Sequence, residues 1–167
     1  MQNLEPPDNH HLSAAVGWLE LGNPGEAKAE VDRIDAKYRT HPLVVRVRCE
    51  VYGREKNWEA VLELARTMIT ETPEDPYGWI SRSNALHFLK RYQEAYDRLL
   101  PAMEKFPGNA EMRYNLACFC CRMNRIEEAR QWLNKAFNLE SGAQLKAAAL
   151  ADPDLELLWA EIRAFNT

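Results

Sequence analysis

The chain has 167 residues, of which 46% are hydrophobic and 28% charged, and its formal net charge is −4. This composition is that of a globular domain and excludes a disordered chain. The acidic balance lacks the basic footprint of a nucleic-acid-binding protein and argues against an anionic membrane surface as partner. No apolar run approaches the roughly 18 residues that a membrane span requires.

The N-terminus, residues 1–12, carries Glu5, Asp8 and two prolines, and it has no basic apolar stretch typical of a secretory signal. We expect residues 1–7 to be a flexible lead and the protein to be cytoplasmic.

The cysteines agree with a cytoplasmic location. Three of the four, Cys118, Cys120 and Cys121, lie within four residues of each other, which is poor spacing for a disulfide framework and indicates reduced thiols.

An internal period of 34 residues organises the sequence from residue 8 onward. Two of the series that recur at this spacing are small residues, namely Ala15, Cys49, Ser83 and Ala117, and then Ala27, Val61, Ala95 and Ala129. A fixed period of this length is the signature of a repeat architecture. It predicts four repeats without insertions, over residues 8–41, 42–75, 76–109 and 110–143.

Each repeat is predicted to be a pair of helices joined by a short turn. In the third repeat, Tyr92, Ala95, Leu99 and Ala102 follow one another at spacings of three and four, which is helical periodicity. Small residues allow two helices to approach closely where they cross. The turns are predicted at polar pairs that include glycine and asparagine, which favour the left-handed conformation that ends a helix. These pairs are Gly22-Asn23, Lys56-Asn57, Lys90-Arg91 and Asn124-Arg125.

One proline, Pro101, falls inside the second predicted helix of the third repeat. An interior proline removes a backbone hydrogen bond, and it predicts a local kink there.

The last segment, residues 144–167, is predicted to be a degenerate capping unit. Residues 144–151 favour a helix, which Asp152-Pro153 ends early. Asp154 is then expected to cap a last helix from Leu155 to about Phe165. The apolar stripe of that helix consists of Leu155, Leu158, Trp159 and Ile162.

These patterns resemble the tetratricopeptide repeat family over residues 8–143. The signature is fullest in the third repeat, in Trp79, Tyr92, Ala95, Leu99, Ala102 and Pro107, whereas the first repeat carries Arg39 where a closing proline is usual. The resemblance implies an all-α, right-handed α-solenoid of four helix-turn-helix repeats plus a C-terminal capping helix pair. The Asp-Pro-Asp-Leu tail is similar to tails that follow bacterial repeats of this family, which implies a bacterial source.

In the resembled family, the first helix of each repeat lines a concave groove that holds peptides. The resemblance therefore implies a scaffold or adaptor that binds a protein or peptide segment, needs no cofactor or metal, and is not an enzyme. Several of the side chains expected in the groove are aromatic, and aromatic residues are enriched at binding hot spots. The expected groove residues are Arg46, Tyr77, Ile80, Asn84, His87, Phe88, Tyr114, Asn115, Cys118 and Arg122.

Some members of the family clamp a carboxylate with two asparagines and basic residues. Asn84 and Asn115 occupy the asparagine positions here, but Ile80, Leu145 and Ala149 stand where the basic partners should be. Because a carboxylate needs charge-assisted donors to offset its desolvation, we do not expect a clamp of this type.

Two alternatives concern Cys118, Cys121 and His87, which are expected to share one face of the groove. They could ligate a soft metal or form a redox-sensitive thiol pair, but a fourth ligand is missing and free cysteine is usually a small buried apolar residue. No phosphate-binding loop or hydrolase motif supports an enzyme.

Two further roles stay open besides the scaffold. One is a dedicated chaperone of the secretion-substrate type, which would form a homodimer through Trp18, Leu19 and Leu21 in the N-terminal repeat. The other is a regulatory subunit of a larger complex.

Overall fold

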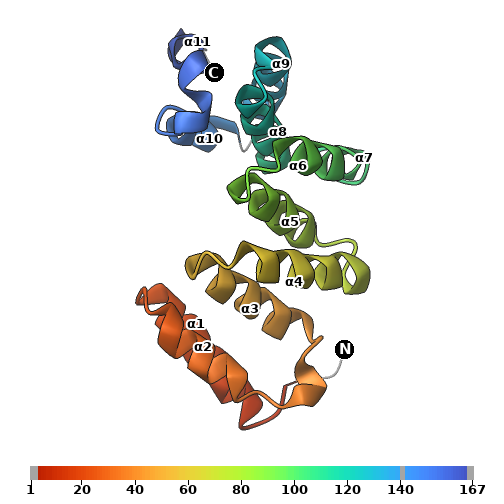
Figure 1. Ribbon diagram of the computed structural model, residues 1–167, viewed down its shortest axis with the longest axis vertical. Helices are drawn as coiled ribbons and strands as arrows, with labels where there is room; N and C mark the ends of the chain where they lie inside the picture. Colours follow the sequence, from red (N-terminus) through yellow and green to blue (C-terminus); the bar gives the residue numbers. More distant parts are fainter. Residues whose placement is uncertain (1–3, 140–141, 165–167) are drawn as a thin grey trace. The chain divides into compact units, whose positions relative to one another are not determined.

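The computed structural model describes residues 4–139 and 142–164, and within those ranges it contains helices and no strand (Figure 1). The predicted all-α fold of helix-turn-helix pairs is confirmed. The α-helices are α1 (Asp8–Glu20), α2 (Pro24–Asp32), α3 (Pro42–Arg54), α4 (Trp58–Glu71), α5 (Pro76–Phe88), α6 (Tyr92–Leu99), α7 (Ala102–Lys105), α8 (Ala110–Arg122), α9 (Ile126–Phe137), α10 (Gly142–Ala149) and α11 (Trp159–Ala164). Two 3₁₀ helices, η1 (Ala36–Tyr38) and η2 (Pro153–Leu158), lie between them.

The helix starts follow the 34-residue period. The first helices of the pairs begin at Asp8, Pro42, Pro76 and Ala110, and the second helices begin at Pro24, Trp58, Tyr92 and Ile126. Prolines stand at three of these starts because the first turn of a helix does not need the N–H that proline lacks. None of the helices within the described ranges is long and apolar enough to cross a membrane.

The predicted left-handed turns are present between the two helices of every pair. Gly22, Lys56, Lys90 and Asn124 have φ values of 74°, 59°, 60° and 59°. After each of them, the next backbone N–H reaches back five residues to a carbonyl, as Asn23 does to Trp18 at 2.8 Å. This pattern is the Schellman motif, which satisfies carbonyls that the end of a helix leaves without partners.

The residue after each left-handed position caps the following helix in one of two ways. Asn23 and Asn57 accept a hydrogen bond on their side chains from the N–H three residues on, at Glu26 and Ala60. In the last two pairs arginine stands at this position and forms an ion pair with the glutamate three residues on, as Arg91 does with Glu94 at 2.6 Å. Both arrangements place an acceptor or a negative charge at the positive end of the helix dipole.

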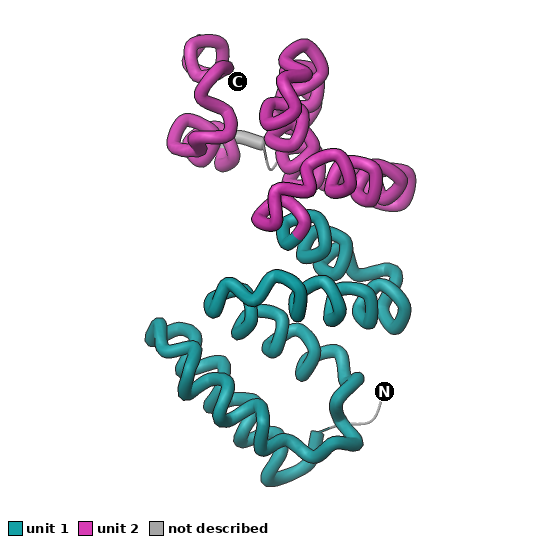
Figure 2. The backbone as a smooth tube through the Cα atoms, viewed as in Figure 1, with its two compact units in different colours: residues 1–85 teal, residues 86–167 magenta. Residues whose placement is uncertain are grey.

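The chain divides into two compact units, residues 1–85 and residues 86–167, which we call unit 1 and unit 2 (Figure 2). The core of unit 1 includes the small residues Ala15 and Ala27, at the crossing of α1 and α2, with Val31, Val44 and Tyr38 around them. Ala15 and Ala27 are members of the two predicted small-residue series, so the periodic residues form this core as expected.

A second close contact in unit 1 depends on Gly78, in the first turn of α5. A Cβ atom at this position would lie 2.9 Å from the Cβ atom of Met68 and 3.2 Å from the backbone nitrogen of Ile69. Real Cβ atoms do not approach so closely, so only glycine allows α5 to lie this near to α4.

The core of unit 2 is built around α8. Met112, Leu116 and Phe119 are almost fully buried, and Leu99 of α6 and Leu133 of α9 are buried with them. Because α8 packs against both α6 and α9, its side chains face neighbours on several sides, and eight of its residues are buried.

The predicted kink at Pro101 is confirmed as a break. The helix that starts at Tyr92 ends at Leu99, and a separate short helix, α7, starts at Ala102. Across the break, the N–H of Met103 reaches only three residues back, to the carbonyl of Leu100 at 3.1 Å. Proline removes the N–H that would continue the α-helical ladder, so the chain tightens locally.

The C-terminal segment differs from the prediction in detail. Residues 153–158 form a 3₁₀ helix rather than the start of an α-helix, and the α-helix begins only at Trp159. Asp152, and not Asp154, is the cap, because its side chain accepts the N–H of Asp154 at 2.9 Å. Leu155, Leu158 and Ile162 are buried as predicted. Phe165, the predicted end, lies outside the described residues.

Candidate partner-binding groove

The expected groove residues fall into both units, and each unit is described separately. Arg46, Tyr77, Ile80 and Asn84 belong to unit 1, and the other six belong to unit 2.

Unit 1 contains an open pocket between α1 and α3. Its volume is about 450 Å³. It is lined mainly by apolar side chains, two of which are well exposed: Val16 at 39% and Leu43 at 54%. The full lining is Leu12, Ser13, Val16, Leu43, Arg46, Val47 and Glu50. An apolar surface that a folded chain leaves open is typical of a binding site.

Arg46 stands at the rim of this pocket and is held in place. Its guanidinium lies 4.1 Å from the centre of the Tyr77 ring and 3.6 Å from a carboxylate oxygen of Asp75. Burial raises the pKa of the Tyr77 hydroxyl above its usual value, so that Tyr77 stays neutral. Glu50 lies one helical turn after Arg46, and the pocket therefore has one side chain of each charge at its edge.

The other two unit 1 residues are less accessible. Ile80 is only 9% exposed and Asn84 is half-buried. The resemblance to the tetratricopeptide repeat family predicted that both side chains line the groove. Ile80 instead contributes to the packed interior and offers little surface to a ligand.

In unit 2, one face of α8 is covered by the chain's own C-terminal segment. The hydroxyl of Tyr114 donates a hydrogen bond to Asp152 at 2.6 Å, and the thiol of Cys118 donates to the same carboxylate oxygen at 3.6 Å. Tyr114 and Cys118 are one turn apart on α8, so one carboxylate reaches both. Cys118 is left only 5% exposed.

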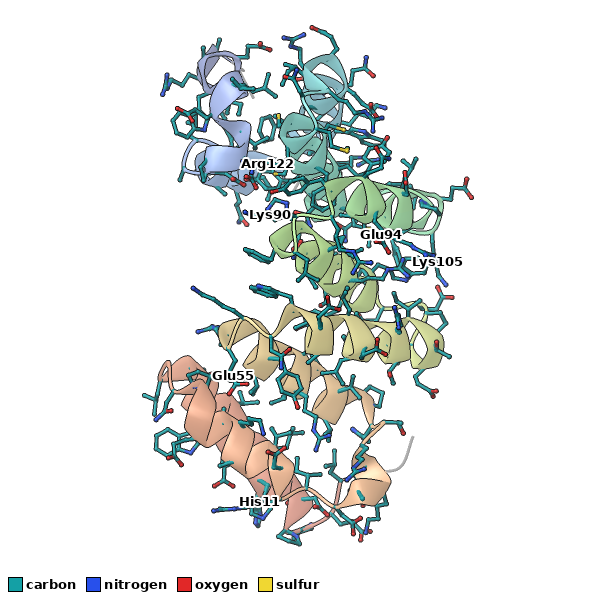
Figure 3. The ribbon with its side chains drawn as sticks, viewed as in Figure 1. His11, Glu55, Lys90, Glu94, Lys105 and Arg122 are labelled. Atoms are coloured by element: carbon teal, nitrogen blue, oxygen red, sulfur yellow. The ribbon has the colours of Figure 1, made fainter. Side chains whose placement is uncertain are left out.

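A second carboxylate, that of Asp154, is held beside the first. His87, near the end of α5, lies with its Nε2 atom 2.8 Å from Asp154, and the Nε atom of Arg122 lies 3.6 Å from the other oxygen. Arg122 is one further turn along α8 and also donates to the hydroxyl of Tyr92 at 3.0 Å. Figure 3 shows Arg122 beside the C-terminal segment.

The charge state of His87 follows from its surroundings. Burial lowers the pKa of the His87 imidazole below its usual value, although the carboxylates of Asp154 and Asp152 oppose this shift. The geometry favours the neutral ring, because Nδ1 is buried with no hydrogen-bond partner and a proton there would have no acceptor. The Nε2–H group of His87 therefore donates a hydrogen bond to the carboxylate of Asp154.

Phe88 and Asn115 are the remaining predicted groove residues of unit 2. Phe88 is 55% exposed and meets His87 edge-on, with 5.5 Å between ring centres. Asn115 is half-buried on α8. The structure thus brings His87, Tyr114, Cys118 and Arg122 together on one face, with Phe88 at its margin.

Burial disfavours the thiolate form of Cys118, Cys120 and Cys121. Burial raises the pKa of Cys118 well above its usual value, and it raises the pKa of Cys121 to about 11 and that of Cys120 to about 12. Thiolates are the form that attacks oxidants and binds metals, and these thiols stay protonated at neutral pH. Within the described part of the chain, no group of three or more His, Cys, Asp or Glu side chains is arranged to hold a metal ion.

The N-terminal residues named for a homodimer lie in different environments. Leu19 is buried in the core of unit 1, and Trp18 packs against that core while remaining partly exposed. Leu21 is 76% exposed. Of the three, Leu21 alone offers a largely free apolar side chain.

Sequence reasoning missed Asp152 and Asp154, which it treated as helix-stop and cap residues. A signal was present in the spacing, since Asp152 follows Cys118 by one 34-residue period. Asp152 nevertheless does not lie on a helix equivalent to α8, because α10 ends at Ala149 and Asp152 is the cap of η2.

Comparison with known proteins agrees with this architecture. Residues 89–160 match the tetratricopeptide repeat family. The solved structure of TTC0263, a thermophilic TPR protein in Thermus thermophilus, is 19% identical with a TM-score of 0.70 and covers 95% of this chain and 100% of its own. The structure named MamA AMB-1 is 21% identical with a TM-score of 0.66, over 84% of this chain and 77% of its own. At these identities the likeness establishes the fold alone, the α-solenoid of helix-turn-helix repeats. No curated protein matched the sequence.

Proposed function

We propose, since the chain is a tetratricopeptide repeat protein, that it is a scaffold that binds a segment of a partner protein in the unit 1 pocket. Tetratricopeptide repeats generally mediate protein–protein interactions, because stacked repeats form extended binding surfaces, and proteins of this family are typically scaffolds rather than enzymes. The observation that carries the proposal is the open apolar pocket between α1 and α3, with Leu43 and Val16 exposed at its surface.

The lining residues indicate the chemistry of the bound segment. A partner side chain such as leucine or phenylalanine would cover Val16, Leu43 and Val47, which gains roughly 1.5–3 kcal/mol for each large apolar side chain buried. Arg46 and Glu50 at the rim would pair with groups of opposite charge and fix the direction of the segment. Because Tyr77 and Asp75 already orient Arg46, little side-chain freedom is lost on binding.

The test starts from peptides selected for binding to the wild-type chain from a random displayed library. Their Kd is then measured for Leu43→Glu and for a matched control, Leu21→Glu. Both positions are exposed leucines, at 54% and 76%, but only Leu43 lines the pocket. We expect Leu43→Glu to weaken binding by about tenfold to a hundredfold, as loss of roughly 1.5–3 kcal/mol requires. Leu21→Glu should leave Kd unchanged. Equal effects of the two substitutions would exclude the pocket as the site.

A further inference from the structure

The C-terminal segment lies on unit 2 in the manner of a bound ligand. Its two carboxylates, Asp152 and Asp154, reach side chains on two other helices: Tyr114, Cys118 and Arg122 on α8, and His87 on α5. Side chains at 114, 118 and 122 stand one turn apart and form one stripe along α8. The stripe and His87 together present four donors to two carboxylates separated by one residue.

A segment that only caps the repeat array does not need these polar contacts, because apolar packing is enough for that role. The apolar side chains Leu155, Leu158 and Ile162 are buried, and η2, which carries the two leucines, packs on α8 and α9. This apolar packing is what a capping segment at the end of a repeat array requires. Placing two carboxylates against a half-buried face costs desolvation, which is offset only where donors are arranged for them. The donors on α8 and α5 meet that requirement.

We propose that this face is a second interaction surface, for a partner segment carrying two aspartates one residue apart and apolar residues after them, and that residues 152–158 are its displaceable internal occupant. The chain's own segment Asp-Pro-Asp-Leu-Glu-Leu-Leu represents the partner's chemistry. This surface lies in unit 2 and is separate from the pocket of the proposed function.

Tethering keeps the face occupied in the isolated protein. A segment attached to the same chain competes at an effective concentration of about millimolar, so a free peptide binds weakly until the internal segment loses its carboxylate contacts. Asn in place of Asp152 preserves the cap of η2, because asparagine is as good a helix cap as aspartate. The double substitution Asp152→Asn with Asp154→Asn therefore weakens the occupant while keeping its shape.

The experiment uses the full chain and a fluorescent peptide of residues 151–159. We expect this peptide to bind the double variant at least tenfold more tightly than the wild type. Adding Arg122→Ala to the double variant, or asparagine for both aspartates of the peptide, should remove the gain. The matched control is Glu156→Gln, which neutralises an exposed carboxylate of the same segment. This variant should bind the peptide with the same affinity as the wild type.

Equal affinity for the wild type and the double variant, or binding that ignores the peptide's aspartates, would overturn the proposal. If circular dichroism shows that the double variant does not fold, hydrogen exchange on the wild type gives the answer. Millimolar peptide should speed exchange at the N–H of Leu155, which is bonded to the carbonyl of Asp152, and unchanged exchange would contradict displacement. Leu43→Glu should alter neither result, so failure here is distinguishable from failure of the unit 1 pocket.

Discussion

At the scale of single residues, the left-handed turn positions were predictable and the side-chain environments were not. The left-handed conformation of Gly22 and Asn124 can be predicted from the residue type, because few other residues adopt a positive φ easily. The same conformation of Lys56 and Lys90 can be predicted only from their positions in the 34-residue period. By contrast, the residues around Cys118 do not indicate that a carboxylate covers it, because only the 34-residue period relates Cys118 to Asp152.

Two glycines in the first helix pair allow a matched test of the turn conformation. A Cβ atom would meet nothing within 4 Å at Gly22 or at Gly17, but only Gly22 has a positive φ, of 74°. We expect Gly22→Ala to reduce the free energy of unfolding by about 1 kcal/mol, the cost of a left-handed alanine. Gly17→Ala, inside α1, should raise it by about 0.5–1 kcal/mol. Urea unfolding measures both, and two changes of the same sign would contradict the assignment.

His87 predicts a pH dependence. Burial lowers the pKa of His87 in the folded chain, whereas the unfolded chain has the ordinary value of about 6.5. As the pH falls below that value the unfolded state takes up the proton first, so stability decreases from about pH 6.5 downward through the folded-state pKa. We expect the urea midpoint of the wild type to fall more between pH 7 and 5 than that of His87→Gln, which lacks the buried imidazole and keeps the other ionisable groups. Parallel curves would show that His87 is not held neutral.

At the scale of elements, helix starts and the break at Pro101 were predictable because they depend on nearby residues. The C-terminal segment was not, because η2 forms where Leu155 and Leu158 pack on α8 and α9. A 3₁₀ turn there lets the two leucines and the two carboxylates face the same surface, a tertiary requirement that local helix preference does not contain.

The break between α6 and α7 predicts that Pro101→Ala stabilises the protein. Alanine restores the missing N–H and lets the two helices join, and we expect the free energy of unfolding to rise by about 1 kcal/mol after the greater freedom of the unfolded chain is counted. The control is Pro107→Ala, at an exposed position between helices, which should lower it by about 0.4–1 kcal/mol. Thermal unfolding of the two variants checks the signs. A Pro101→Ala variant no more stable than Pro107→Ala would mean that the break is favoured by its surroundings.

At the scale of the whole molecule, the fold followed from the 34-residue period, whereas the location of the open surface did not. The resemblance to the family predicted that the first helices of all repeats line the groove in the same way. The structure distinguishes them, because the face of α8 holds Asp152 and Asp154 while the pocket between α1 and α3 is open. Only side-chain contacts between distant segments make that distinction.

The central claim, that partners bind in the unit 1 pocket, is tested most directly by placing a thiol there. The four native cysteines are buried, so a single exposed thiol can be alkylated selectively. Alkylation rates are measured for Leu43→Cys and Leu21→Cys, each with and without a saturating selected peptide. We predict that the peptide slows alkylation at position 43 by at least tenfold and leaves the rate at position 21 unchanged. Undiminished alkylation at position 43 in the saturated complex would contradict the claim.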